Sequence, residues 1–473
     1  MAPTLRIASG LLAAATAVSG ASWIPSFMTK DVVIIGGGAG GGYAAVRLKE
    51  DFHKDIVVVE KASKLGGHVS TYTDPASGKS FDYGVQNFNN YGPAAAFFQR
   101  LGVSTGPAPP RIPLATQYAD FTTGAQVNWT APDAAARSAA LATFLNVTAP
   151  WEDLFIPGWT NFPQPNQIPA DLLLPFRDFV TKHNLHAIVN QVFQVTGSGA
   201  GNMMDALTLY VLSAFGQPMI KTFLGQLGAL YTASGRNIEV YEKIGQRLGN
   251  AVLYNSVVTS SIRTSLFHTI FVKNQVTGKT TVIFTKKLLI AIQPTPANTE
   301  PLNLDVYEQS VLSKFNWQTV HAGLVSHPSL PINGSVVNMP AAAAPDNYLV
   351  LPTVDYNIRF DYFGQNLFRV LMVGDKNFSK AKAQQLIRNT VSKLIQAGTL
   401  PASTAQVQFP AWADHGPMHM HVTKQELQNG FIQKLNSLQG RRDTWWTGGA
   451  FSHQFQALIW AFNDLLLPQL VAA

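Results

Sequence analysis

The stretch Asp31-Val32-Val33-Ile34-Ile35-Gly36-Gly37-Gly38-Ala39-Gly40-Gly41-Gly42 decides the fold of this chain. Its apolar first half predicts a buried strand, and the glycines that follow predict a tight turn into a helix. Gly36, Gly38 and Gly41 match the pattern G-x-G-x-x-G. In that pattern the first glycine permits the turn, the second lets the backbone approach a pyrophosphate, and the third lets the helix pack on the strand. The N–H groups and positive end of that helix would face the phosphates.

A second apolar run, Ile56-Val57-Val58-Val59, leads directly to Glu60. This carboxylate lies 24 positions beyond Gly36, about where an acid bonds a ribose hydroxyl in dinucleotide-binding folds. The order of strand, glycine-rich turn, helix, strand and acid therefore predicts a Rossmann-like α/β domain with a central parallel sheet.

The composition limits the class of protein. The chain has 473 residues, of which 46% are hydrophobic and 13% charged, so it is globular and long enough for two or three domains. The absence of cysteine excludes disulfides, thiolate nucleophiles and cysteine metal sites. The net charge of +7 is spread over the sequence without a long Lys/Arg run, so we expect no nucleic-acid partner.

The N-terminus has the pattern of a secretory signal. Arg6 supplies a positive charge, residues 7–18 are apolar, and small residues precede an expected cleavage after Gly20. We therefore expect residues 1–20 to be a signal peptide, and the mature protein to be secreted without an integral membrane segment. Four glycosylation triplets support export, and they begin at Asn128, Asn146, Asn333 and Asn377.

The chain divides into interleaved segments. Residues 104–113 are rich in Pro and Gly, residues 251–292 alternate in strand fashion, and residues 379–398 predict an amphipathic helix. We predict a nucleotide-binding domain assembled from residues 29–112, 222–300 and 405–473. A second domain, from residues 113–221 and 301–404, would be inserted into it.

Four further segments follow the first motif: Leu65-Gly66-Gly67-His68, Asp82-Tyr83-Gly84-Val85-Gln86, a central strand around Val258, and Trp446-Thr447-Gly448-Gly449-Ala450. In this order they resemble the flavin-containing amine oxidase and phytoene desaturase superfamily, in particular fungal proteins of the β-cyclopiazonate dehydrogenase type. The resemblance implies FAD as the cofactor, a binding domain of the glutathione-reductase type, and an inserted α+β substrate domain.

The resemblance also implies roles along the cofactor. Gly36, Gly38 and Gly41 would hold the pyrophosphate, and Glu60 the adenosine ribose. The positions implied beside the flavin or the adenine are Gly66, Gly67, His68, Gly84, Val85, Gln86, Val258, Gly448, Gly449 and Ala450. Most of the superfamily has arginine where this chain has His68. Two alternatives follow: FAD is attached covalently through His68, or this histidine packs beside it non-covalently.

The catalytic candidates lie in the C-terminal part of the chain. Residues 411–421 hold three histidines among aromatic and apolar residues, and His415 is the candidate for moving a substrate proton. Trp446 is a candidate for the wall of a pocket beside the flavin. His419 and His421 share one face of a strand, but no third ligand is evident, so we expect no metal site.

These observations together predict the chemistry. A second G-x-G-x-x-G unit for a nicotinamide is absent, which favours oxygen as the electron acceptor. We expect a secreted FAD-dependent oxidoreductase that removes a hydride from a C–N or C–H bond of a small organic substrate. Two alternatives are a flavin-dependent double-bond isomerase of an unsaturated lipid, and a flavin-binding protein without catalytic activity.

Overall fold

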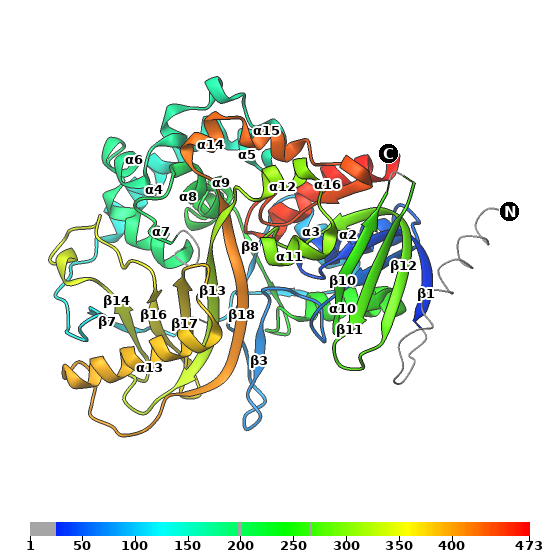
Figure 1. The fold of residues 1–473 in the computed structure, drawn as a ribbon. Helices are drawn as coiled ribbons and strands as arrows, with labels where there is room; N and C mark the ends of the chain where they lie inside the picture. The colour runs from blue at the N-terminus through cyan, green and yellow to red at the C-terminus, as the bar shows by residue number, and fades with distance from the viewer. Residues whose placement is uncertain (1–24, 111, 197–200, 265) are drawn as a thin grey trace, which may run out of the picture.

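Two seven-stranded sheets form the framework of the protein, and Figure 1 shows them side by side. The computed structural model describes residues 25–110, 112–196, 201–264 and 266–473. The expected signal peptide, residues 1–20, lies outside the described residues. Within these ranges, none of the helices has the length and apolar character needed to cross a bilayer.

The first sheet contains the glycine-rich turn. Its strand order is β10-β11-β12-β1-β2-β9, and β19 also pairs with β12. Neighbouring strands run parallel from β19 through β12, β1 and β2 to β9, whereas β11 is antiparallel to both β10 and β12. The strands are β1 (Ser26–Ile35), β2 (Ile56–Val59), β9 (Val252–Leu253), β10 (Ser256–Arg263), β11 (His268–Asn274), β12 (Thr280–Ile290) and β19 (Thr444–Trp446).

Burial explains the apolar run that opens this sheet. Val32, Val33 and Ile34 are at most 1% exposed, because a parallel sheet is covered on both faces. Helix α2 packs against both α10 and α16, and α10 also contacts α3. These helices are α2 (Ala39–Glu50), α3 (Ala94–Leu101), α10 (Glu239–Leu248) and α16 (Gln456–Ala472). The parallel sheet with its helices confirms the predicted Rossmann-like α/β fold.

The second sheet has the order β18-β13-β17-β16-β14-β7, with β15 paired to β17. All of its pairs are antiparallel except β14 with β7. The strands are β7 (Ala115–Ala119), β13 (Asn316–Ser326), β14 (Gly334–Asn338), β15 (Tyr356–Asn357), β16 (Arg359–Gly364), β17 (Leu367–Gly374) and β18 (Gln408–His421). One predicted boundary is therefore wrong: residues 408–421, assigned with 405–473 to the FAD-binding domain, pair along their length with β13 of this sheet. The other domain boundaries stay predictions.

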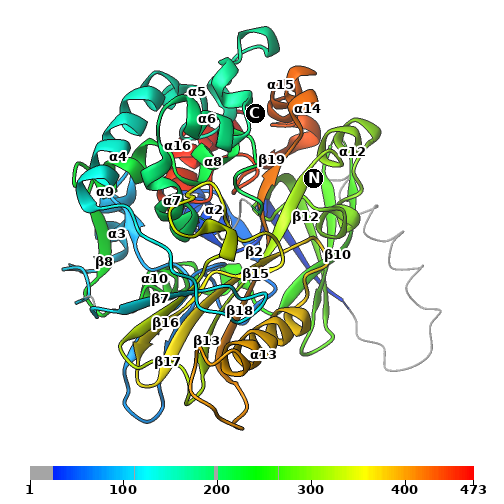
Figure 2. The ribbon, with the colours of Figure 1, turned by 90° about the vertical axis from the view of Figure 1, so that its left-hand side faces the viewer.

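Helices lie on both sides of the second sheet, as Figures 1 and 2 show. On one side α13 (Lys380–Gln396) buries Ile387 and Leu394 against the sheet, which confirms the predicted amphipathic helix. On the other side lies a helical layer whose core includes Phe144, Phe176 and Phe215. Its helices are α4 (Ala134–Thr148), α5 (Glu152–Phe155), α6 (Phe176–Lys182), α7 (Val189–Thr196), α8 (Thr208–Ala214) and α9 (Gln217–Phe223). This sheet and its helices form the expected α+β part of the fold.

Short elements connect the two sheets. Strands β3 and β4 form a hairpin, and β8 pairs with both β5 and β6. The strands are β3 (Thr71–Thr73), β4 (Ser80–Asp82), β5 (Phe88–Asn89), β6 (Thr105–Gly106) and β8 (Ala229–Thr232). The remaining α-helices are α11 (Pro296–Thr299), α12 (Val306–Leu312), α14 (Lys424–Gln428) and α15 (Phe431–Asn436).

Candidate cofactor and substrate site

Four parallel strands of the first sheet end at one edge. β1 leads to Gly36, β2 to Glu60, β12 to the segment with Gln293, and β19 to Gly448. Ligands of open α/β sheets bind outside the carboxyl ends of the strands. Residues that the sequence placed along one cofactor are thus brought to the same edge by the topology.

The turn after β1 requires its glycines. Gly36 has φ of +100°, and a Cβ on it would lie 2.7 Å from Cγ2 of Ile292. A Cβ on Gly41 would lie 1.8 Å from the Gly36 carbonyl oxygen, so any side chain there would push the turn away from α2. The N-cap of α2 is Gly38, and no side chain caps this end. The first-turn N–H groups are thus available to an anion.

The Glu60 carboxylate is fixed beside this turn. It is buried, and it accepts hydrogen bonds from the backbone N–H of Gly37 and of Ala62, each at 2.7 Å. A carboxylate has more lone pairs than these two bonds use, so it can also accept from ribose hydroxyls. Ser256 donates its N–H to the Glu60 carbonyl at 2.9 Å, which brings β10 and its Val258 to this end of the sheet. The adenine role of Val258 stays a prediction.

The loop that carries His68 closes over the turn. A Cβ built on Gly38 would lie 3.5 Å from the Cα of Gly67, so the two glycines face each other. A Cβ on Gly84 would lie 2.3 Å from the His68 carbonyl oxygen. The structure therefore brings together the segments 36–41, 66–68 and 84. The next two residues implied for the cofactor differ in exposure: Val85 is half-buried, whereas Gln86 is exposed.

The C-terminal segment completes the edge. The Thr447 hydroxyl donates to Asn463 of α16 at 2.6 Å, and Asn463 donates to the Gly40 carbonyl at 2.8 Å. A Cβ on Gly449 would lie 2.9 Å from Nε2 of Gln293, whose Oε1 is buried with no hydrogen-bond partner among the described residues. Close glycine backbone beside an unpaired polar atom fits a ligand that passes along residues 448–450.

His415 contacts His68 rather than standing alone. The two imidazoles stack with centroids 4.7 Å apart, and His68 donates from Nε2 to the His415 carbonyl at 3.0 Å. Burial lowers the pKa of both histidines, that of His415 well below its usual value. Both rings are therefore neutral near pH 7. Nε2 of His415 is buried without a partner among the described residues.

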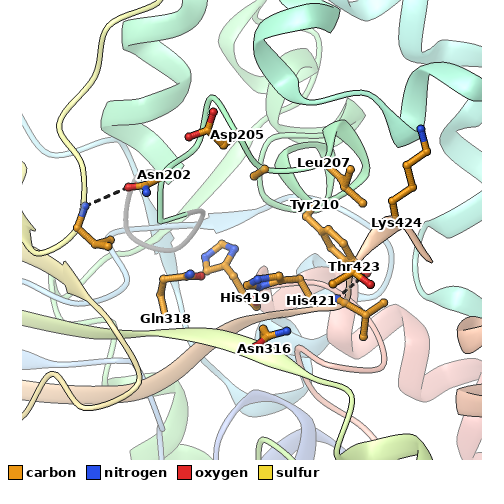
Figure 3. A pocket seen from close by; sticks show the side chains of 13 residues that line it. Asn202, Asp205, Leu207, Tyr210, Asn316, Gln318, His419, His421, Thr423 and Lys424 are labelled. Atoms are coloured by element: carbon orange, nitrogen blue, oxygen red, sulfur yellow. Dashed lines mark hydrogen bonds between the residues drawn. The ribbon is translucent and has the colours of Figure 1, made fainter. Parts of the chain in front are cut away.

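A pocket of about 390 Å³ is lined by His419 and His421, which follow His415 on the same strand, β18 (Figure 3). His419 and His421 of β18 and Asn316 and Gln318 of β13 form one wall, and the segment before α8 forms the other. The lining residues are Asn202, Asp205, Ala206, Leu207, Tyr210, Asn316, Gln318, Val354, His419, His421, Val422, Thr423 and Lys424.

A β-bulge orients His419. Gln318 pairs with Met418 and Asn316 with His421, so His419 and Met420 together oppose the single residue Trp317. His419 has φ of +51°, a conformation that few residues other than glycine adopt. Bulges redirect side chains, and they are frequent beside active sites. His419 and His421 both line the pocket.

The pocket offers unpaired hydrogen-bonding atoms. Nδ1 of His419 and Oε1 of Gln318 are buried without partners among the described residues. Burial lowers the pKa of His419 to about 3. Nδ1 of His421 donates to the His419 carbonyl at 2.8 Å, and burial also lowers the pKa of His421. Since the neutral ring holds its proton on Nδ1, Nε2 has a free lone pair. The Tyr210 hydroxyl accepts from the Val422 N–H at 3.0 Å, which leaves its own proton to donate.

The two catalytic candidates from the sequence lie elsewhere. His415 contacts His68 and does not line the pocket. Trp446 is fully buried and stacks on Phe451 at 5.7 Å, so the structure gives it a packing role, and a part in catalysis stays a prediction. Sequence reasoning missed Tyr210 and Gln318, which belong to segments without a motif. Among the described residues, no three His, Asp or Glu side chains are grouped to hold a metal ion.

Comparison with known proteins identifies the family of this chain. Residues 34–101 match the family model of the NAD(P)-binding Rossmann-like domain. The chain is 32% identical over 449 residues to the FAD-dependent oxidoreductase pigF of Monascus ruber, covering 94% of this chain and 93% of pigF. The chain belongs to this family of FAD-dependent oxidoreductases. The oxidoreductase is also 28% identical to beta-cyclopiazonate dehydrogenase of Aspergillus flavus, with 95% of each chain covered. The expected resemblance, the FAD cofactor and the enzyme class are thereby confirmed.

Solved structures show the same fold. The CLA-producing fatty acid isomerase from P. acnes superposes with a TM-score of 0.68 at 16% identity, covering 93% of this oxidoreductase and 98% of the isomerase. Cyclohexylamine oxidase from Brevibacterium oxydans gives a TM-score of 0.58 at 16% identity, covering 94% and 99%. At such identities the likeness establishes the amine-oxidase-type fold alone.

Proposed function

We propose that this FAD-dependent oxidoreductase removes a hydride from a small organic substrate held in the pocket of His419 and His421, and that oxygen reoxidises the flavin. One observation carries the proposal. Strand β18 links the pocket to the cofactor edge, because His415 of this strand stacks on His68, and His68 follows the glycine pair that faces Gly38.

The residues present fit FAD. Gly36, Gly38 and the N-terminus of α2 would hold the pyrophosphate, and Glu60 the adenosine ribose. The remaining contacts would come from the loops 66–68, 84–86 and 448–450. When bound, the flavin supplies the acceptor for two electrons and a hydride.

The chain's own groups would bind and deprotonate the substrate. The carboxamide of Gln318 and the hydroxyl of Tyr210 are placed to orient a polar group. Nε2 of His421 can accept the proton that the substrate releases as its hydride leaves. Amides, imidazoles and a phenol line this pocket, which supports a polar substrate over the unsaturated lipid of an isomerase.

The first experiment is the visible spectrum of the purified protein, followed by oxygen consumption with a panel of alcohols and amines. We expect flavin bands, bleaching by a substrate under argon, and peroxide formation in air. Flavin bands with turnover of a substrate but no oxygen uptake would overturn oxygen as the acceptor. A folded, FAD-supplied protein without flavin bands would overturn the cofactor assignment.

Attachment of FAD through His68 is also proposed. Its Nε2 holds the proton that bonds the His415 carbonyl, so the neutral ring keeps a lone pair on Nδ1 for a bond to the flavin. The new bond would replace a C–H bond of the flavin, whose hydrogen would leave as a proton while its two electrons stay on the flavin until oxygen takes them up. Acid precipitation tests this, since covalent flavin stays in the pellet and His68→Ala should release it. Colour in the supernatant of the unaltered protein would show that His68 is a non-covalent neighbour.

Secretion is proposed from the N-terminal pattern of the sequence. The asparagines of all four glycosylation triplets are exposed, which supports this proposal. The expected result is a secreted product that begins near Ala21 and loses mass on treatment with an N-glycosidase. A protein retained in the cell with residues 1–20 intact would contradict it.

A further inference from the structure

The pocket of His419 and His421 shows what kind of substrate it accepts. We infer that it binds an uncharged molecule whose reacting end carries a hydroxyl group, and that it excludes ammonium ions. The inference rests on the proposed function, because it names the substrate class of the same site.

The charges around the pocket oppose a cation. Asp205 is the one carboxylate among the thirteen lining residues, and it is exposed and paired with Arg177 at 2.7 Å. Lys424 is exposed at the rim. Lys376 lies nearby, with its ammonium 4.4 Å from the centre of the Trp317 ring, and its charge acts on His421. An ammonium substrate would therefore meet two lysines and no free carboxylate.

The inner wall is also neutral. His419 is buried and His421 is half-buried, and burial lowers the pKa of both, so both rings are uncharged at neutral pH. A carboxylate bound at their level would lose its hydration without meeting a buried cation. The wall therefore disfavours charge of either sign at the reacting end of the substrate.

The hydrogen-bonding atoms of the wall fit a hydroxyl group. Oε1 of Gln318 and Nε2 of His421 can each accept a hydrogen bond, while the Tyr210 hydroxyl can donate one. A hydroxyl both donates and accepts, so it can satisfy both kinds of atom. An apolar group in the same place would leave the buried Gln318 oxygen and His419 Nδ1 unpaired.

The corresponding reaction balances. The C–H bond of the carbinol carbon would break, and FAD, when bound, would supply the acceptor for its hydride and both electrons. The O–H bond would break, its proton would pass to Nε2 of His421, and the C–O bond would become a carbonyl. In the proposed oxidase cycle, oxygen would take up the two electrons.

Three probes of one shape separate the charge classes: benzyl alcohol, benzylammonium and benzoate. Their binding to the full flavin-loaded protein is measured by ligand-observed NMR, which does not depend on flavin absorbance. We expect benzyl alcohol to bind at least about tenfold more tightly than either ion, because neither ion meets a buried opposite charge at the inner wall. Tighter binding of benzylammonium or benzoate, or no binding of the alcohol, would overturn the inference.

Variants localise the binding. Gln318→Met and His419→Leu should each weaken benzyl alcohol binding by about tenfold, since each removes a buried hydrogen-bonding group. His419→Asn should retain binding, because asparagine tolerates a positive φ and keeps a polar side chain. Gln385→Met on the exposed face of α13 is the matched control and should leave binding unchanged. Equal binding by all variants would place the alcohol outside this pocket.

The two proposals fail separately. A protein without flavin refutes the proposed function, whereas its preference among the probes can still be measured. A flavin-loaded protein that prefers benzylammonium refutes only the substrate class.

Discussion

Gly41 and Gly42 are neighbours in the first turn of α2, but their environments predict opposite effects of an added methyl group. A Cβ on Gly41 would lie 1.8 Å from the Gly36 carbonyl oxygen and 3.0 Å from its carbon. Both are backbone atoms of the phosphate turn, so the clash cannot be relieved by moving a side chain. A Cβ on Gly42 would meet nothing nearer than the Tyr241 ring at 3.5 Å, which is ordinary van der Waals contact.

The magnitudes follow from these distances. Alanine is favoured over glycine inside a helix by about 1 kcal/mol, so Gly42→Ala should stabilise the protein by roughly this amount. Gly41→Ala gains the same helix propensity, but its methyl group would push the turn away from the helix. Such overpacking costs about 1–3 kcal/mol or more in stability. The displaced turn is also the pyrophosphate site. Each loss of about 1.4 kcal/mol in binding would lower FAD affinity tenfold.

The assay compares both variants with the unaltered protein by thermal unfolding and by the ratio of flavin to protein absorbance. Gly41→Ala should lower both the melting temperature and the flavin content, while Gly42→Ala should raise the former and keep the latter. A Gly41→Ala protein with full flavin content and an unchanged melting temperature would refute the assignment of this turn. Loss of flavin in both variants would show that neither position tolerates a methyl group. The distances from the added Cβ would then fail to distinguish Gly41 from Gly42.

Three further results are expected. Glu60→Gln should weaken FAD binding by about 1–2 kcal/mol, because a neutral amide accepts hydrogen bonds more weakly than a carboxylate. Loss of flavin on ultrafiltration measures this change, and undiminished retention of flavin would contradict the ribose role of Glu60. His421 must be neutral to act as the base, so kcat/KM should be at its maximum above the pKa of His421 and fall as the pH drops through it. Burial and the charge of Lys376 lower that pKa, so the fall in kcat/KM should lie below pH 6.5. His421→Asn should abolish this pH dependence. Arg263→Met should lower the unfolding free energy by up to about 3–5 kcal/mol, because the buried Glu308 carboxylate loses its 2.6 Å partner and keeps Arg442 at 3.2 Å. Adding Glu308→Gln should recover part of this loss, and equal melting temperatures of Arg263→Met and the unaltered protein would argue against it.

The cofactor half of the site was predictable because its signals are local. Gly41 is required by its contact with Gly36 five positions earlier, Gly36 has a positive φ, and Glu60 follows the next strand. Such short-range sequence patterns indicate the local backbone geometry directly. The parallel sheet then follows, because an apolar run such as residues 32–35 without alternation is typical of strands buried on both faces.

The substrate half was not predictable for the opposite reason. The pocket combines residues from segments about a hundred positions apart in the chain: Tyr210, Gln318 and His421. No sequence pattern indicates that these segments are close in space. The histidine-rich stretch was noticed, but strand alternation could not foresee the bulge that orients His419. The same limit applies to β18, because a strand signal does not say which of two sheets the strand joins.

The hydrogen bonds from Thr447 to Asn463 and from Asn463 to Gly40 have a consequence for biosynthesis. The helix that follows the phosphate turn is held by α16, and the bonded residues Gly40 and Asn463 are 423 positions apart in the chain. Strand β1 likewise waits for β12, its neighbour some 250 positions later. During translation the nascent chain therefore has only half of its nucleotide site until α16 has been made. Flavin capture waits for these distant segments to pack together, and it reports that they have done so.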